Sequence, residues 1–116
     1  MKKPSPSTLA KWTKVWHDHH AKHRMCAMCM VNPAAEIHHL VPKRHLATRW
    51  HPLNGLALCH ACHQESEHGP HKDFRSFNDT WLKANRPVQH QFFWDHAYKI
   101  EQPDWAAIKA MVEGMK

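Results

Sequence analysis

The sequence reads CAMC at residues 26–29 and CHAC at residues 59–62, and these two pairs hold all four cysteines of the 116-residue chain. A Cys-x-x-Cys spacing turns two thiolates toward one ion, and two such pairs complete a tetrahedral site. The predicted ligands of one structural Zn²⁺ are Cys26, Cys29, Cys59 and Cys62. A thioredoxin-like redox pair and free structural thiols remain as alternatives.

The segment between the two pairs predicts two short strands. Residues 36–41 (EIHHLV) form an apolar and histidine-rich run that a proline stops, and residues 56–58 (LAL) follow a turn signal at residues 52–55. The composition of residues 59–68 suits a helix, which Gly69 and the proline after it should end. A zinc ion would clamp the first strand to the turn after the second, which stabilises a domain with little apolar surface to bury.

Helical patterns flank this middle part. A cap-plus-proline start at residues 5–8 predicts a helix that ends near Arg24. Its expected inner face carries Leu9, Trp12, Trp16, His19 and His23. His19 and His23 have the spacing of a metal chelate, but we interpret them as packing residues.

The last third of the chain also predicts helices, with starts at Pro87 and Pro103. Its apolar stripes consist of Phe74, Phe77, Trp81 and Leu82, and then of Trp105, Ile108 and Val112. We interpret these stripes as core packing rather than as a platform for base stacking, because apolar residues at helical spacing usually face a core.

Composition limits the class of protein. Lys and Arg total 16 against 10 Asp and Glu, which gives a net charge of +6 with all 14 histidines neutral. This charge fits a nucleic-acid partner and a solvated basic surface equally well. No apolar run is long enough for a membrane span, and the basic N-terminus has no apolar stretch behind it. We therefore expect a cytoplasmic protein without membrane association.

Read together, Cys26-x-x-Cys29, the EIHHLVP run of residues 36–42 and the PLNGLALCHACH run of residues 52–63 resemble the zinc-containing branch of the HNH endonucleases. The resemblance covers residues 26–68. It implies an α+β fold with a small ββα-metal (His-Me finger) core over residues 25–69, flanked by an N-terminal helix (1–24) and a C-terminal helical segment (70–116) in a single domain (1–116). Small free-standing members are often encoded by phages, which would place this chain in the cytoplasm of a host cell.

The resemblance also implies roles for particular residues. His39 would be the general base, and Asn54 would hold the loop between the strands and orient His39. His38 and His63 would bind a catalytic divalent ion, for which Mg²⁺, Mn²⁺, Ni²⁺ and Zn²⁺ are the candidates. Glu67 is our own candidate for a third ligand, because it lies four residues after His63 on the expected helix.

These residues predict a metal-dependent DNA endonuclease that nicks one strand per monomer. Three basic residues of the loop between the strands are candidates for binding DNA phosphates, or else belong to a solvated loop: Lys43, Arg44 and Arg49. A double-strand break would need two copies or two visits, and the expected partners besides DNA are a second copy of the chain or a protein such as a packaging terminase. The alternative is a zinc-stabilised nucleic-acid-binding adaptor without catalytic activity, and a third reading is thiol-disulfide exchange.

Overall fold

A computed structural model describes all 116 residues. It combines five α-helices and two π-helical turns with one two-stranded antiparallel sheet, so the predicted α+β character is confirmed. The elements in chain order are α1 (Pro6–Ala21), β1 (Glu36–His39), β2 (Gly55–Leu58), η1 (Ala61–Glu65), α2 (Phe74–Ser76), η2 (Phe77–Leu82), α3 (Lys83–Asn85), α4 (Pro87–His96) and α5 (Trp105–Gly114).

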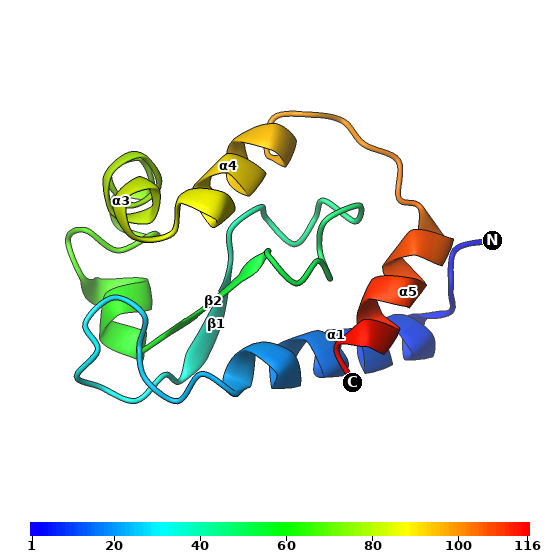
Figure 1. The fold of residues 1–116 in the computed structure, drawn as a ribbon, viewed down its shortest axis with the longest axis horizontal. Coiled ribbons are helices and arrows are strands. Elements are labelled where there is room, and N and C mark those ends of the chain that lie inside the picture. Colours follow the sequence, from blue (N-terminus) through cyan, green and yellow to red (C-terminus); the bar gives the residue numbers. More distant parts are fainter.

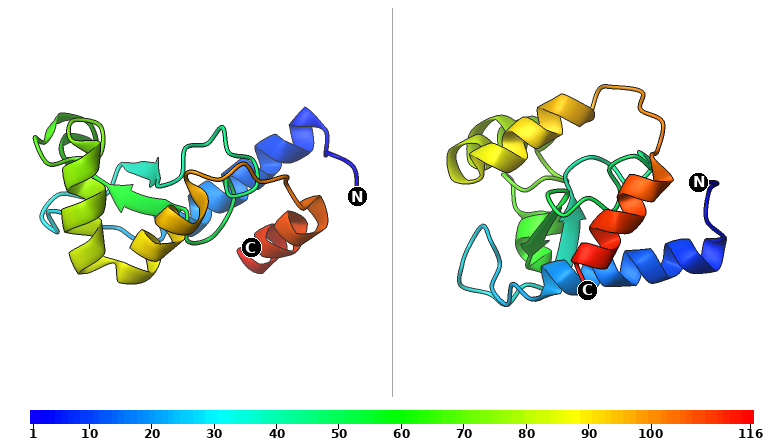
Figure 2. Two further views of the ribbon diagram at one scale, coloured as in Figure 1. Left: turned by 90° about the horizontal axis from the view of Figure 1, so that it is seen from above. Right: turned by 45° about the vertical axis from the view of Figure 1, so that its right-hand side comes forward.

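The sheet lies in the middle of the molecule, with α1 along one side and the α3–α4 region on the other (Figure 1). Helix α5 returns from the far end of α4 and packs beside α1, which both further views show (Figure 2). No helix combines the length and the apolar character that crossing a membrane requires.

Helix α1 begins as predicted, because Ser5 caps it by accepting a hydrogen bond from the backbone N–H of Thr8. Its buried face differs from the predicted one. The residues that turn inward are Trp12, Trp16 and His20, whereas His23 is exposed. Helix α1 ends at Ala21, earlier than the predicted end near Arg24, so His23 lies beyond the helix.

The indole rings of α1 join a core with the C-terminal helix. Trp12 packs edge-on against Trp50, with ring centroids 5.7 Å apart, and both rings contact Trp105. Ile108 and Val112 of α5 are fully or almost fully buried in the same cluster. The predicted core role is therefore confirmed for the stripe of Trp105, Ile108 and Val112. In the other predicted stripe Phe77 and Leu82 are fully buried, whereas Phe74 is 44% exposed and lies at the surface.

Strand β1 is shorter than predicted and ends at His39. The strand stops because the backbone of Val41 bonds to a side chain rather than to the sheet: its N–H donates to the Asn54 side chain at 2.7 Å, and its carbonyl accepts from that side chain at 3.1 Å. In the sheet, His38 pairs with Leu56 and His39 pairs with Gly55.

The helix predicted over residues 59–68 is shorter in the structure and has the wider π-helical geometry. It is the single π-helical turn η1, which Ser66 ends in extended conformation. The chain then folds back at Gly69, where a Cβ would lie 2.1 Å from the carbonyl oxygen of Cys62. Only glycine permits this close approach, and the fold-back brings residues 70–73 over η1.

Candidate metal centres and active site

The four cysteines form one cluster. Their sulfur atoms all lie within 4.8 Å of one another, and the Sγ atoms of Cys29 and Cys59 are 3.9 Å apart. A Zn–S bond of about 2.3 Å in a tetrahedron places neighbouring sulfurs ~3.8 Å apart, so these donors fit a zinc ion. All four thiols are free of disulfides. The cluster can therefore hold structural zinc.

Asn32, which follows the first pair, donates hydrogen bonds to one sulfur of each pair. The N–H of Asn32 donates to the Cys29 sulfur at 3.5 Å, and its side-chain amide donates to the Cys59 sulfur at 3.8 Å. The turn that allows this contains Met30, the one non-glycine residue with a left-handed backbone (φ 56°). Such N–H groups stabilise thiolates, which is the form that binds zinc.

The pKa values of the cysteine thiols shift in opposite directions. The backbone N–H groups of Asn32 and Val31 lower the pKa of Cys29 to about 6. Burial and the neighbouring thiols raise the pKa of Cys62 well above its usual value. Four negative charges in this space need a cation, and a divalent ion supplies it.

A second cluster contains three histidines. The Nε2 atom of His63 lies 3.1 Å from His38 Nδ1 and 2.9 Å from His71 Nε2, and the three donor atoms lie within 4.8 Å of one another. Imidazole ligands at Zn–N distances near 2.05 Å stand ~3.3 Å apart in a tetrahedron. We call this group the histidine triad, and its donor set fits one transition-metal ion, so it can hold a second metal.

Glu36 orients the triad from strand β1. One of its carboxylate oxygens accepts a hydrogen bond from His63 Nδ1 at 2.6 Å, and the other accepts from His60 Nδ1 at 2.8 Å. These hydrogen bonds lower the pKa of Glu36 to about 2. Because Nδ1 of His63 carries a proton, its Nε2 presents a lone pair to the other two histidines, as in metal-bound histidines that a carboxylate supports.

The third member of the triad differs from our sequence-based candidate. Glu67 is exposed and forms no contact with the triad, because η1 ends before reaching it. His71, which no sequence pattern singled out, takes that position after the fold-back at Gly69. Glu36 was also missed, although its i, i+2 spacing to His38 on a strand places both on one face.

His39 lies on the opposite face of the sheet from His38, as adjacent strand residues do. Its ring stacks on Trp16 with centroids 4.1 Å apart and an interplanar angle of 13°. Burial lowers its pKa to about 4, with a further contribution from the positive charges of Arg49 and Lys43, and a hydrogen bond with the backbone of Arg49 acts in the opposite direction. His39 is half-buried and neutral at pH 7.

Asn54 is fully buried and holds the loop between the strands. Besides its two bonds with Val41, its Nδ2 donates to the carbonyl of Thr48 at 3.1 Å. The next residue is Arg49, whose backbone bonds to the His39 ring. Asn54 thus supports the position of His39 through the loop, without a direct contact between the two side chains.

The three basic residues of the loop lie at two different locations: Lys43 and Arg49 lie near His39, and Arg44 lies away from it. The charges of Lys43 and Arg49 act on His39, and the Arg49 guanidinium lies 5.2 Å from the Trp50 ring centroid. Arg44 instead lines a second cavity together with His96 and Lys99.

Comparison of the chain with models of known protein families, with curated proteins and with solved structures finds no match.

Proposed function

We propose that this chain is a metal-dependent DNA endonuclease of the HNH class, with the histidine triad as the catalytic metal site of a ββα-metal core. The observation that carries the proposal is the convergence of three imidazoles on one point: His63 Nε2 lies 3.1 Å from His38 Nδ1 and 2.9 Å from His71 Nε2, and Glu36 orients His63. A structural site alone does not require this second donor set.

In this proposal His39 acts as the general base. Its neutral imidazole takes a proton from water while the water oxygen attacks the phosphorus, the bond to the 3′ oxygen breaks, and the products are a 5′-phosphate and a 3′-hydroxyl. Proton transfer of this kind contributes about 10²–10⁴-fold to a rate. His38, His63 and His71 would hold a divalent ion, which would supply Lewis-acid stabilisation of the phosphoryl oxygens and of the leaving oxygen.

Lys43 and Arg49 have the position to contact phosphates that flank the scissile bond, because both lie close enough to His39 to influence its charge. One triad cleaves one strand, so a monomer nicks. A double-strand break would need a second copy or a partner protein.

Plasmid relaxation tests the proposal, with Mg²⁺, Mn²⁺, Ni²⁺ or Zn²⁺ added to the zinc-loaded protein. We expect nicked circles with at least one of these ions, no nicking by His63→Ala, and a loss of about 10²–10⁴-fold for His39→Ala. His17→Ala, on the exposed face of α1, is the matched control and should cleave as wild type does. Equal cleavage by wild type and His63→Ala would contradict the proposal.

One observation favours the adaptor alternative. The Trp16 ring covers one face of His39, so this histidine has a packing role, and an adaptor does not need it as a base. An adaptor should bind DNA and the structural zinc but cleave with none of the four ions. It should also hold a single metal ion per chain. The same protein preparations therefore distinguish the two functions.

A further inference from the structure

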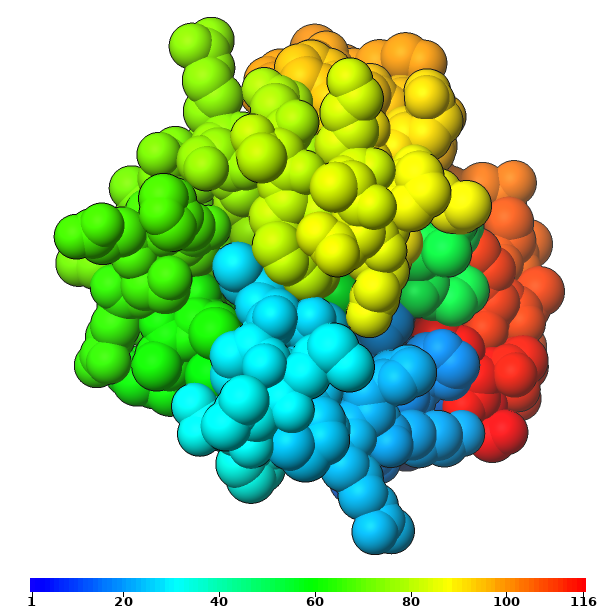
Figure 3. Space-filling view, turned by 60° about the vertical axis from the view of Figure 1, so that its left-hand side comes forward, coloured from blue at the N-terminus to red at the C-terminus, as the bar shows by residue number.

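A pocket of about 530 Å³ opens beside β2, and no residue of the histidine triad lines it. Three segments surround it: the end of α1, the loop with the first cysteine pair, and the junction of α3 and α4. These segments meet on one face of the molecule, where they are blue, cyan and yellow (Figure 3). The pocket contains none of the triad residues, and Cys26 is its one residue from the cysteine cluster.

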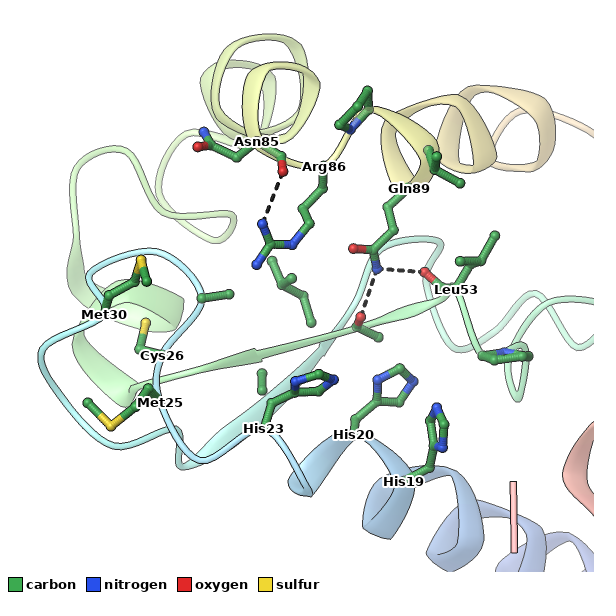
Figure 4. A pocket seen from close by; sticks show the side chains of 17 residues that line it. His19, His20, His23, Met25, Cys26, Met30, Leu53, Asn85, Arg86 and Gln89 are labelled. Carbon is green, nitrogen blue, oxygen red and sulfur yellow. Dashed lines mark hydrogen bonds between the residues drawn. The ribbon is translucent and has the colours of Figure 1, made fainter. Parts of the chain in front are cut away.

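Several side chains of the pocket are basic. Arg86 points into it from the α3–α4 junction, and three histidines point into it from α1 and the residues just after it (Figure 4): His19, His20 and His23. No aspartate or glutamate lines the pocket. The Arg86 guanidinium bonds to a single backbone carbonyl, that of Asn85 at 3.0 Å, and lies 6.0 Å from the Trp81 ring centroid. Most of its donor capacity is therefore available to a ligand.

Helix α4 adds donors at the same place. It begins at Pro87, and no side chain caps it. The backbone N–H groups of Val88 and Gln89 have no acceptor within the helix, and both residues line the pocket. The N-terminal end of a ten-residue helix carries partial positive charge, which favours an anion.

His20 provides an independent sign of a missing partner. It is only 5% exposed and its Nε2 atom has no hydrogen-bond partner. The ring lies over Gly55, where a Cβ would approach Nε2 to 2.4 Å. Burial and the charges of neighbouring histidines lower its pKa to about 4, as expected for a basic cluster without a counter-ion. A buried polar nitrogen without a hydrogen-bond partner is costly, and a ligand group that bonds to it would relieve this cost.

The apolar part of the pocket limits the size of the ligand. Met25, Met30, Leu53 and Val88 line the rest of the wall. A volume above ~300 Å³ is typical of sites for organic molecules rather than for a bare ion. The ligand should therefore carry both an anionic group and an apolar or aromatic body.

We propose that this pocket binds a phosphate monoester of nucleotide size, with the phosphate between Arg86 and the start of α4 and the base or sugar against the methionines. The phosphorylated end of a nucleic-acid strand and a free mononucleotide share this chemistry. The assignment does not depend on the endonuclease proposal, because the triad and the pocket have no residue in common.

Calorimetric titration of the zinc-loaded full chain tests this site. The probes are a nucleoside 5′-monophosphate, the same nucleoside without phosphate, and two oligonucleotides that differ in a 5′-phosphate or 5′-hydroxyl end. We expect saturable binding of the monophosphate, at least 10-fold weaker binding of the nucleoside, and a similar loss for the monophosphate in Arg86→Gln. Tighter binding of the 5′-phosphorylated strand than of the mononucleotide would assign the site to strand ends, and equal binding would assign it to free nucleotides.

The matched control is Arg75→Gln, which removes an exposed arginine outside the pocket and should leave the affinity unchanged. Arg86→Lys keeps the charge and should recover part of the affinity, which separates a ligand contact from a folding defect. Equal affinity for nucleoside and monophosphate, an Arg86→Gln variant that binds as wild type does, or no saturable binding would each overturn the proposal. Cleavage of plasmid DNA plays no part in these readouts.

Discussion

The cysteine cluster and the histidine triad share one short segment but are built in different ways. Cys62 and His63 are adjacent in η1, and each belongs to a different cluster. The cysteine cluster uses two local pairs, whereas the triad draws one residue each from β1, η1 and the segment after Gly69. The comparison teaches that a metal site made of local pairs is visible in a sequence, while one made of single residues depends on how the chain folds back.

The largest expected effect is the loss of stability when the cysteine cluster is disrupted. Cys26→Ser removes a buried ligand, so the zinc ion should be lost and the first cysteine pair should separate from the hairpin. We expect a destabilisation above about 5 kcal/mol, because structural zinc contributes folding free energy directly. Thermal unfolding by circular dichroism and the zinc content of the purified protein measure it. Unchanged stability with zinc absent would show that the cluster is not a structural site.

The second prediction separates the two clusters by metal content. His63→Ala should lower the content from two ions per chain to one without changing the fold, since the cysteine cluster is untouched. Elemental analysis after dialysis against Zn²⁺ measures the number, and His68→Ala, an exposed neighbour, is the control. Two ions in His63→Ala, or one in wild type, would argue against the triad as a metal site.

The third prediction concerns the loop that supports His39. Asn54→Ala leaves two buried backbone groups without a partner, the N–H and the carbonyl of Val41, and removes one of the two hydrogen bonds to the carbonyl of Thr48. We expect a loss of about 2–4 kcal/mol in the free energy of unfolding, measured with urea, while both metals remain bound. Asn85→Ala removes an exposed amide hydrogen bond and should cost much less. A similar cost for both variants would show that the Asn54 bonds contribute little.

The fourth prediction tests the carboxylate that orients the triad. Glu36→Gln removes the negative charge facing His63 Nδ1, which should weaken metal binding at the triad about 10–100-fold and leave the cysteine site unchanged. Competition with a chromophoric chelator measures both affinities. Glu67→Gln is the matched control because Glu67 is exposed and outside the triad. Equal effects of the two substitutions would contradict the orienting role.

The smallest expected effect is a pH dependence that comes from outside both clusters. The pKa of His20 is about 4 in the folded chain and near 6.5 when exposed, so the unfolded chain binds the extra proton first as pH falls. His20 therefore stabilises the fold above about pH 6.5, and this contribution decreases as pH falls toward 4. Unfolding of wild type and His20→Phe by urea at pH 7 and pH 5 should show a smaller pH effect in the variant. His23→Phe, at an exposed position, should keep the wild-type dependence.

Several features were readable from residues and their spacing. The Cys-x-x-Cys pairs predicted the cysteine cluster, the cap at Ser5 predicted the start of α1, and the proline at residue 87 predicted the start of α4. Each Cys-x-x-Cys pair, the cap and the proline act within a few residues, where backbone geometry fixes what can meet, and the shared chemistry of the two pairs indicated that they bind one ion. The roles of His38, His39, Asn54 and His63 in catalysis stay predictions.

The tertiary structure decided the contacts that join distant segments. The sequence alone did not select His71 over Glu67, because the choice depends on η1 ending early and on the close approach of Gly69 to the Cys62 carbonyl. It did not reveal that His20, rather than His23, faces inward over Gly55. Spacing along the chain determines which side chains share a local turn, whereas steric fit between separate segments determines which of them meet in space.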